Sequence, residues 1–336
     1  MKFIMKEMPL YCNFKKYEKN MNDNPLVSVI IPAYNAGKYI ESAVKSVFNQ
    51  SYNNIELVVV NDGSTDNTLD ILSQFSSIKI ISTPNKGVSH ARNTGIDVSK
   101  GEYIFFLDAD DELEYNAIAI LLQICKKNNA DICGGLAYST QKKEVKYSER
   151  FLDGDALLHY CIEDNPNTYV VWAKLYKRCF IDKTRFPIGM RVAEDSFFNC
   201  ELSLKKPKCV FISKIIYFYR VHEMSLSREK ESDTFLDINQ LSKIKYEMIL
   251  KKFPEYKDYA KNILIKSDMA VLKKIMTFKN ADYENFEKKC IKNICENAAY
   301  FIPATKFDKK FFFIITHHLY YLFKIYFNAK VCVNFF

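Results

Sequence analysis

The sequence lacks the cysteine and signal patterns of metal-bound or secreted small domains. Ten cysteines are scattered over 336 residues without a Cys-x-x-Cys pair, and the closest two are Cys290 and Cys295. This spacing argues against a zinc ribbon or finger. Residues 1–16 also lack the sustained apolar stretch of a signal peptide. We therefore expect a cytoplasmic protein whose cysteines are reduced and mostly buried.

The glycine motifs that cradle phosphates are absent as well. No G-x-G-x-x-G follows any apolar run, and no G-x-x-x-x-G-K-[ST] occurs anywhere in the chain. These absences argue against a dinucleotide fold and a P-loop. A nucleotide, if one binds, must be held by carboxylates and a metal ion instead.

The bulk composition is that of a globular protein, with 48% hydrophobic residues. The formal net charge of +8 is compatible with nucleic acid, an anionic membrane surface or a phosphate-bearing ligand, and it does not decide among them. No nucleic-acid readout motif accompanies the charge, so we expect no nucleic-acid partner.

Apolar runs of strand length alternate with helical patterns in the first part of the chain. The expected strands are 26–31, 55–60, 78–82 and 103–108, and the expected helices are 37–50, 64–75, 87–99 and 115–128. Strands that are apolar throughout, each followed by a helix, indicate a parallel sheet covered on both faces. The sequence therefore predicts an α/β fold with a mostly parallel, Rossmann-like sheet and a helical C-terminal region.

The changes in pattern along the chain predict its organisation. We expect a polar leader (1–25), an α/β domain (26–228) made of a nucleotide-binding half (26–115) and an acceptor half (116–228), and a helical region (229–336). We find no internal repeats and no low-complexity segments.

The expected strands end in polar residues that meet at one edge of the sheet. The stretch "FFLDADDELE" runs directly from an apolar strand into Asp108, Asp110 and Asp111, while Lys86 and Arg92 follow the third strand. In open parallel sheets the ligand lies beyond the carboxyl ends of the strands. The Asp-x-Asp spacing suits Mg²⁺ or Mn²⁺, and the cations suit a diphosphate. An Asp pair can also simply begin a helix, so the spacing alone is a weak signal.

The C-terminal tail, 309–336, is rich in aromatic residues and carries four lysines. Its longest aromatic portion is shorter than the roughly 20 apolar residues that a membrane span needs. We expect an interfacial helix on an anionic membrane surface, which places the protein at the inner face of the cell membrane. The competing interpretation is a helix that packs on the protein or on a second copy, giving a homo-oligomer.

Four segments together resemble the nucleotide-sugar-binding half of family 2 glycosyltransferases, which are inverting enzymes of the GT-A fold. They are "VSVIIPAYN", "VVVNDGSTDNT", "NKGVSHARNTGI" and "GEYIFFLDADD", and a thinner match continues to about residue 227. The family's processive members carry a Gln-x-x-Arg-Trp motif, which is absent here. The resemblance therefore implies a non-processive enzyme.

The resemblance also implies roles for individual residues. Asp62 would bind the base, Asp108 the ribose, and Asp110 the metal ion that bridges the diphosphate. His222 matches a position near the diphosphate and metal, although a lone histidine is more often structural. The implied nucleotide-sugar contacts are Pro32, Tyr34, Asn35, Asp62, Ser64, Lys86, Arg92, Asp108 and Ala109.

The acceptor half contributes the expected catalytic base. Asp195 in "AEDSFF" matches the family's general base, with Glu194 beside it on the acceptor side. Inverting transfer needs such a base to take the proton of the acceptor hydroxyl. The alternative is that these acids merely favour a helix N-terminus. Trp172, the only tryptophan, either stacks on the acceptor sugar or belongs to the core.

The resulting hypothesis is transfer of a sugar from a nucleoside-diphosphate sugar, UDP-linked by preference, to a saccharide or lipid-linked acceptor. Mn²⁺ or Mg²⁺ would assist the reaction, and the product would belong to polysaccharide biosynthesis. Two alternatives remain at this point. One is a nucleotidyltransferase on a similar sheet, and the other is a non-catalytic saccharide-binding module.

Overall fold

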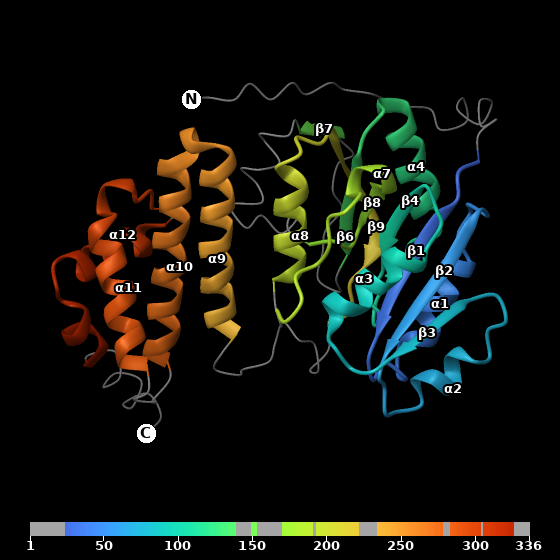
Figure 1. Ribbon diagram of the computed structural model, residues 1–336, viewed down its shortest axis with the longest axis horizontal. Coiled ribbons are helices and arrows are strands. Elements are labelled where there is room, and N and C mark those ends of the chain that lie inside the picture. Colours follow the sequence, from blue (N-terminus) through green and yellow to red (C-terminus); the bar gives the residue numbers. More distant parts are fainter. Residues whose placement is uncertain are drawn as a thin grey trace. The chain divides into compact units, whose positions relative to one another are not determined.

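The computed structural model describes residues 24–138, 149–152, 170–190, 193–221, 234–277, 283–303 and 305–325. The chain forms two compact units, Met1–Ser225 and Leu226–Phe336. Figure 1 labels their helices and strands. The leader, apart from residues 24 and 25, and the last part of the tail lie outside the described residues. The domain boundaries drawn from the sequence stay predictions.

The first half of the first unit is the expected parallel sheet. Its strands are β1 (Val27–Ala33), β2 (Ile55–Asp62), β3 (Lys79–Thr83) and β4 (Tyr103–Phe106), joined by α1 (Ile40–Phe48), α2 (Thr68–Leu72) and α3 (Val88–Val98). β1 lies between β2 and β4 and is parallel to both. Every residue of β1 is buried, because helices cover both faces of the sheet.

The two faces have separate apolar cores. On one face, α1 and α4 (Ala117–Asn128) bury their apolar sides against the sheet in the main cluster. On the other face, Val58 and Val60 of β2 pack against Ala91 of α3. α3 is seen in front of the sheet in Figure 1, and α1 behind it. Helices on both faces are what the continuous apolar strands predicted.

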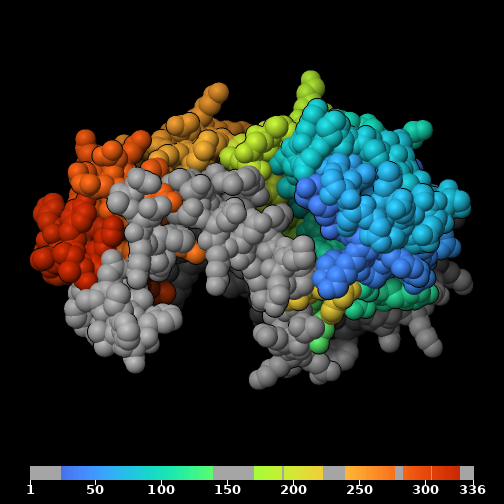
Figure 2. Space-filling model, turned by 90° about the horizontal axis from the view of Figure 1, so that it is seen from below, coloured from blue at the N-terminus to red at the C-terminus, as the bar shows by residue number. Residues whose placement is uncertain are grey.

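The second half extends the same sheet with mixed strand directions. It adds β5 (Glu112–Leu113), β6 (Ile132–Tyr138), β7 (Glu149–Leu152), β8 (Lys174–Lys177) and β9 (Cys209–Phe218), with α7 (Arg178–Ile181) and α8 (Glu194–Ser203). The order is β3-β2-β1-β4-β8-β6-β9-β5, and β7 also pairs with β9. β8 is antiparallel to both β4 and β6, whereas β6 and β9 are again parallel. β9, the last strand among the described residues, lies between β6 and the short β5. In Figure 2 the first half, coloured blue to teal, gathers as one continuous surface.

The second unit is helical, as the sequence predicts. It contains α9 (Thr234–Lys252), α10 (Lys257–Thr277), α11 (Glu284–Glu296) and α12 (Lys306–Thr316), with short 3₁₀ turns at Pro254–Tyr256 and Ala298–Tyr300. α12 begins with a capping box, in which Thr305 and Asp308 each accept a hydrogen bond from the other's backbone N–H. Among the described residues, no helix is long and apolar enough to cross a membrane.

Candidate active site

The ends of β1 and β2 form one hydrogen-bonded rim. Asn35, in the left-handed region with φ 47°, donates from its backbone to the Ser64 hydroxyl at 3.0 Å, and its side chain accepts from the backbone of Thr65 at 2.8 Å. Pro32 is buried opposite Val60 in the sheet. The ring of Tyr34 is 52% exposed, which leaves it available to a ligand.

Asp62, at the end of β2, organises the loop that leads into α3. Its two carboxylate oxygens accept the backbone N–H groups of Lys86 at 3.0 Å and Gly87 at 2.7 Å. The Asp62 side chain is buried, whereas Lys86 is exposed. Asp62 therefore fixes the loop, and the side chain of Lys86 in that loop faces solvent.

Arg92 joins the two halves of the sheet through a buried ion-pair cluster. Its guanidinium donates to Asp108 Oδ1 at 2.9 Å and to Glu194 Oε1 at 2.6 Å. Asp108 follows β4, whereas Glu194 begins α8. Burial alone lowers the pKa of Arg92, but the neighbouring charges of Asp108 and Glu194 outweigh it and raise the pKa above its usual range. The cluster brings the start of α8 to the ends of the nucleotide-side strands.

Asp195 follows Glu194 in the first turn of α8. Burial of its carboxyl group, followed by the charge of Glu194, raises the pKa of Asp195 to about 7, although the charge of Arg92 opposes the shift. A carboxylate tuned to this range suits a general base at neutral pH, because it accepts a proton readily and is still partly ionised. The backbone before it is strained: Ala193 has φ 63°.

The loop after β4 holds the three acids predicted from the sequence. Ala109 and Asp111 are buried, while Asp108 and Asp110 are partly exposed. Burial, and then the charges of Asp108 and Asp110, raise the pKa of Asp111 to about 8. The Tyr217 hydroxyl donates to Asp111 at 2.7 Å. Asp111 is thus a structural member of the loop rather than one facing solvent.

A metal ion fits this loop by the chemistry of its donors. Mg²⁺ and Mn²⁺ prefer hard oxygen ligands, and Mg²⁺ commonly uses only one or two protein carboxylates. Asp110 offers such a group. The described residues contain no group of three or more His, Cys, Asp or Glu side chains placed to hold a metal ion. His222, the other expected metal contact, lies outside the described part of the chain.

Trp172 belongs to an aromatic stack beside the loop. Its ring stacks on Tyr217 with centroids 5.1 Å apart and on Tyr219 at 5.9 Å. Trp172 is only partly buried and packs against the edge of the main core. The structure thus shows Trp172 packed against the core and partly exposed, and its stacking on an acceptor sugar stays a prediction.

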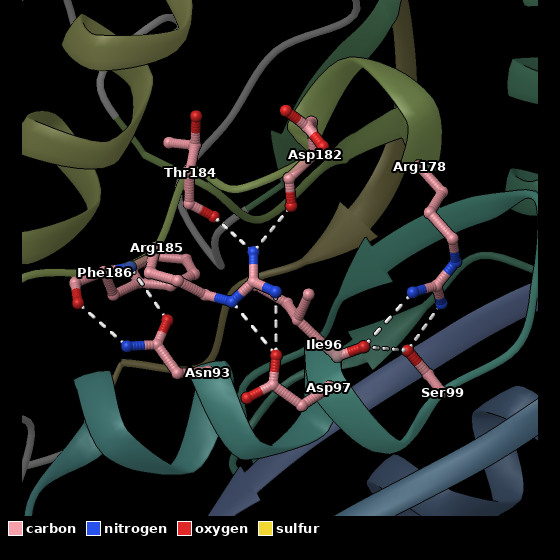
Figure 3. A network of polar contacts seen from close by, with 9 residues as sticks. All are labelled: Asn93, Ile96, Asp97, Ser99, Arg178, Asp182, Thr184, Arg185 and Phe186. Carbon is pink, nitrogen blue, oxygen red and sulfur yellow. Dashed lines mark hydrogen bonds and ion pairs between the residues drawn. The ribbon is translucent and has the colours of Figure 1, made fainter.

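A second connection between the halves was not expected from the sequence. The Asn93 side chain accepts from the backbone N–H of Phe186 and donates to its carbonyl, both at 2.8 Å. Arg185 forms an ion pair with Asp97 one helical turn further on. Figure 3 shows these side chains of α3 pointing toward the segment that precedes α8. Phe186 itself lies under Arg92, with its ring 5.3 Å from the guanidinium carbon.

Comparison with known proteins agrees with this architecture. The model of the family described as Glycosyl transferase family 2 matches residues 28–191. The glycosyltransferase GlyG of Streptococcus pneumoniae is 30% identical over 225 residues, covering 60% of this chain and 73% of the relative. GlyA of the same organism is 34% identical over 219 residues, but this match covers 60% of the chain and 31% of GlyA, so the chain corresponds to about a third of that protein.

The fold also matches a solved structure. S. aureus TarS 1-349 in complex with UDP-GlcNAc superimposes with a TM-score of 0.64 at 18% sequence identity, over 91% of each chain. The chain belongs to glycosyltransferase family 2 and has the GT-A fold. It is therefore a glycosyltransferase, and neither a nucleotidyltransferase nor a non-catalytic binding module.

Proposed function

We propose that this glycosyltransferase transfers a sugar from a UDP-sugar to a saccharide or lipid-linked acceptor, with inversion and with the help of Mn²⁺ or Mg²⁺. The observation that carries the proposal is the ion-pair cluster in which Arg92 and Glu194 are buried and Asp108 is partly exposed. It brings a carboxylate with a pKa of about 7, Asp195, to the strand ends that bear the residues assigned to the donor. The product is part of a cell-surface or related glycan.

The nucleotide sugar is assigned to the edge formed by the ends of β1, β2 and β4. The exposed ring of Tyr34 borders the base, and the rim of Asn35 and Ser64 gives that border a fixed shape. Lys86 is an exposed cation in the loop that Asp62 holds, and it is assigned to the base or the phosphates. The UDP preference is supported by TarS, which was solved with UDP-GlcNAc.

The chemical step is an in-line displacement. The acceptor hydroxyl oxygen forms a bond to the anomeric carbon while the bond from that carbon to the diphosphate oxygen breaks. Asp195 takes the proton of the hydroxyl, a contribution of roughly 10²–10⁴-fold in rate. Asp110, with His222, would hold the metal ion, which when bound stabilises the charge of the diphosphate leaving group.

The other side chains of the site arrange these groups. Arg92 holds Glu194 next to Asp195, while its second ion pair fixes Asp108, the residue assigned to the ribose. Trp172 offers the accessible part of its ring to the acceptor sugar, because aromatic faces pack well on apolar sugar faces. In this proposal the donor side and the acceptor side share one cation, Arg92.

The test is a transfer screen across nucleotide sugars with Mn²⁺ or Mg²⁺, with the anomeric configuration of the product determined by NMR. We expect transfer with inversion from a UDP-sugar, loss of activity with EDTA, and restoration by added Mn²⁺. Asp195→Asn should abolish turnover while UDP still binds. Retained configuration, or undiminished turnover in that variant, would contradict the proposal.

We further propose that the second unit contacts an anionic membrane surface at the cytoplasmic side. α12 buries Phe311 and Ile315 in its core, while its opposite side exposes Lys306, Lys310 and Phe313. The short helical segment after α12 exposes further large apolar side chains, among them Leu322 at 66% and Ile325 at 68%. Basic and aromatic side chains on one side of a helix are typical of interfacial helices. A second copy of the chain is the competing occupant of this surface.

A further inference from the structure

Tyr217 in β9 and Arg220 just after β9 hold the loop 108–112. Tyr217 is completely buried. Its hydroxyl oxygen accepts the backbone N–H of Asp108 at 3.2 Å and its proton is donated to Asp111 Oδ2 at 2.7 Å. One hydroxyl group therefore fixes the backbone at the first acid of the loop and the side chain of the third.

Arg220 fixes the remainder of the same loop. Its backbone N–H donates to Asp111 Oδ1 at 2.8 Å, and its Nε donates to the carbonyl oxygen of Asp110 at 3.0 Å. The end of its guanidinium forms an ion pair with Glu112. Three consecutive residues of the loop are thus bound by one arginine.

These contacts counteract the electrostatic repulsion between carboxylates of the loop. Asp108 and Asp110 lie two positions apart, and their like charges repel each other and disfavour a charge on the buried Asp111 between them and β5. Without fixed partners the loop would relax toward arrangements that separate the carboxylates. Binding a cation would then require the loop to return to one arrangement, and that reorganisation would weaken the affinity.

We propose that Tyr217 and Arg220 are positioning residues that preorganise the loop 108–112 for its metal ion. The inference rests on the metal role that the proposed function gives to Asp110. Neither residue touches the reacting groups in this scheme. They act through the backbone of Asp108 and Asp110 and through the buried side chain of Asp111, as the residues behind a metal ligand commonly do.

Tyr217 also links this loop to the acceptor side. The same ring whose hydroxyl holds Asp108 and Asp111 stacks on Trp172 with an interplanar angle of 19°. Removing only the hydroxyl separates the two roles, because Tyr217→Phe keeps the ring and its stack. Arg220→Lys keeps the positive charge but loses the planar arrangement of donors that reaches both Asp110 and Glu112.

The experiment measures Mn²⁺ binding without donor or acceptor, from the EPR signal of free Mn²⁺ during a titration. We expect Tyr217→Phe and Arg220→Lys to bind Mn²⁺ roughly 10–100-fold more weakly than the wild type, which is the usual effect of changing a residue behind a metal ligand. Circular dichroism of each variant confirms that it is folded at the temperature used.

Tyr176→Phe is the matched control. Tyr176 is also completely buried, and its hydroxyl donates to Asn199 at 2.9 Å, away from the loop. We expect this variant to lose stability but to keep the wild-type Mn²⁺ affinity. Equal Mn²⁺ affinity in Tyr217→Phe, Arg220→Lys and the wild type would overturn the inference, and so would an equal loss in Tyr176→Phe.

Asp110→Asn separates this inference from the proposed function. If the wild type binds Mn²⁺ and Asp110→Asn does not, the metal role stands and the positioning variants decide the inference alone. If the wild type binds no Mn²⁺, the metal role of Asp110 and this inference both fail, whereas sugar transfer itself is still decided by the transfer screen.

Discussion

Arg92 and Glu194 form a buried ion pair at 2.6 Å although 102 residues separate them in the chain. Arg92 belongs to α3 in the donor half, and Glu194 opens the helix that bears the proposed base. The same guanidinium holds Asp108 at the end of β4. One cation therefore connects the residue assigned to the ribose with the helix assigned to proton transfer.

Replacing Arg92 should therefore lower the free energy of unfolding. Arg92→Ala leaves Asp108 and Glu194 without their cation, and breaking a buried ion pair from one side costs about 3–5 kcal/mol of unfolding free energy. Urea denaturation measures the loss. Lys45→Ala, which removes an exposed pair with Glu41, is the control and should cost less than about 1 kcal/mol. Similar losses in the two variants would show that the cluster is not a stabilising unit.

The pH dependence of turnover should reflect the pKa of the proposed catalytic base, Asp195. Asp195 has a pKa of about 7 and must be ionised to accept a proton, so kcat/KM should rise with pH and reach half its plateau near pH 7. Asp195→Asn should give a rate that is lower by at least about 10²-fold and does not rise across this range. A wild-type profile that is flat from pH 5 to 8 would assign the proton to another group.

Gly63 and Gly189 offer a matched pair of substitutions. Both have positive φ, at 72° and 84°, so alanine is strained by about 1 kcal/mol at either position. At Gly63 the new Cβ would also lie 2.6 Å from the backbone nitrogen of Asn85, whereas nothing lies within 4 Å at Gly189. We expect the free energy of unfolding, measured by urea denaturation, to fall by about 1–3 kcal/mol more in Gly63→Ala than in Gly189→Ala.

The same pair tests the donor site. Gly63 lies between Asp62 and Ser64, so the displaced loop should weaken UDP binding measured by calorimetry. Gly189→Ala should leave that affinity unchanged. Equal UDP affinities in the two variants would place the nucleotide away from this loop.

Membrane binding should depend on the lysines of α12. Flotation with phosphatidylglycerol vesicles should recover the wild-type protein, and changing Lys306, Lys309 and Lys310 to Glu should reduce the bound fraction, since each lysine near an anionic surface contributes about 1 kcal/mol. The control changes Lys251, Lys252 and Lys257 to Glu, which alters the net charge equally on another part of the unit. Equal binding of both variants, or none by the wild type, would contradict a membrane role for α12.

Much of the first half of the sheet was predictable because it follows from local patterns. The apolar runs located β1 to β4, and the rule that ligands lie beyond the ends of parallel strands pointed to Asp62 and Asp108. α2 is shorter than the range expected for it, because Asp66 accepts hydrogen bonds from Thr68 and the helix proper begins only there. The composition also indicated the helical second unit.

The contacts between the halves could not be predicted, since they depend on the order of strands in the sheet. Nothing local marks Tyr217 as the partner of Asp111, or Asn93 as the partner of Phe186. Both pairs join segments about a hundred residues apart. The burial of Asp111 becomes understandable only when β9 is placed beside β5.

The position of β9 has a consequence for how the protein is made. The loop 108–112 leaves the ribosome about a hundred residues before Tyr217 and Arg220, which at 5–20 residues per second amounts to roughly 5–20 s. During that interval Asp111 has neither of its partners from the end of β9. The donor half can collapse early through its local strand–helix contacts, but its acidic loop reaches its final form only with the last strand. Assembly of the candidate active site is therefore completed only after Tyr217 and Arg220 have been synthesised.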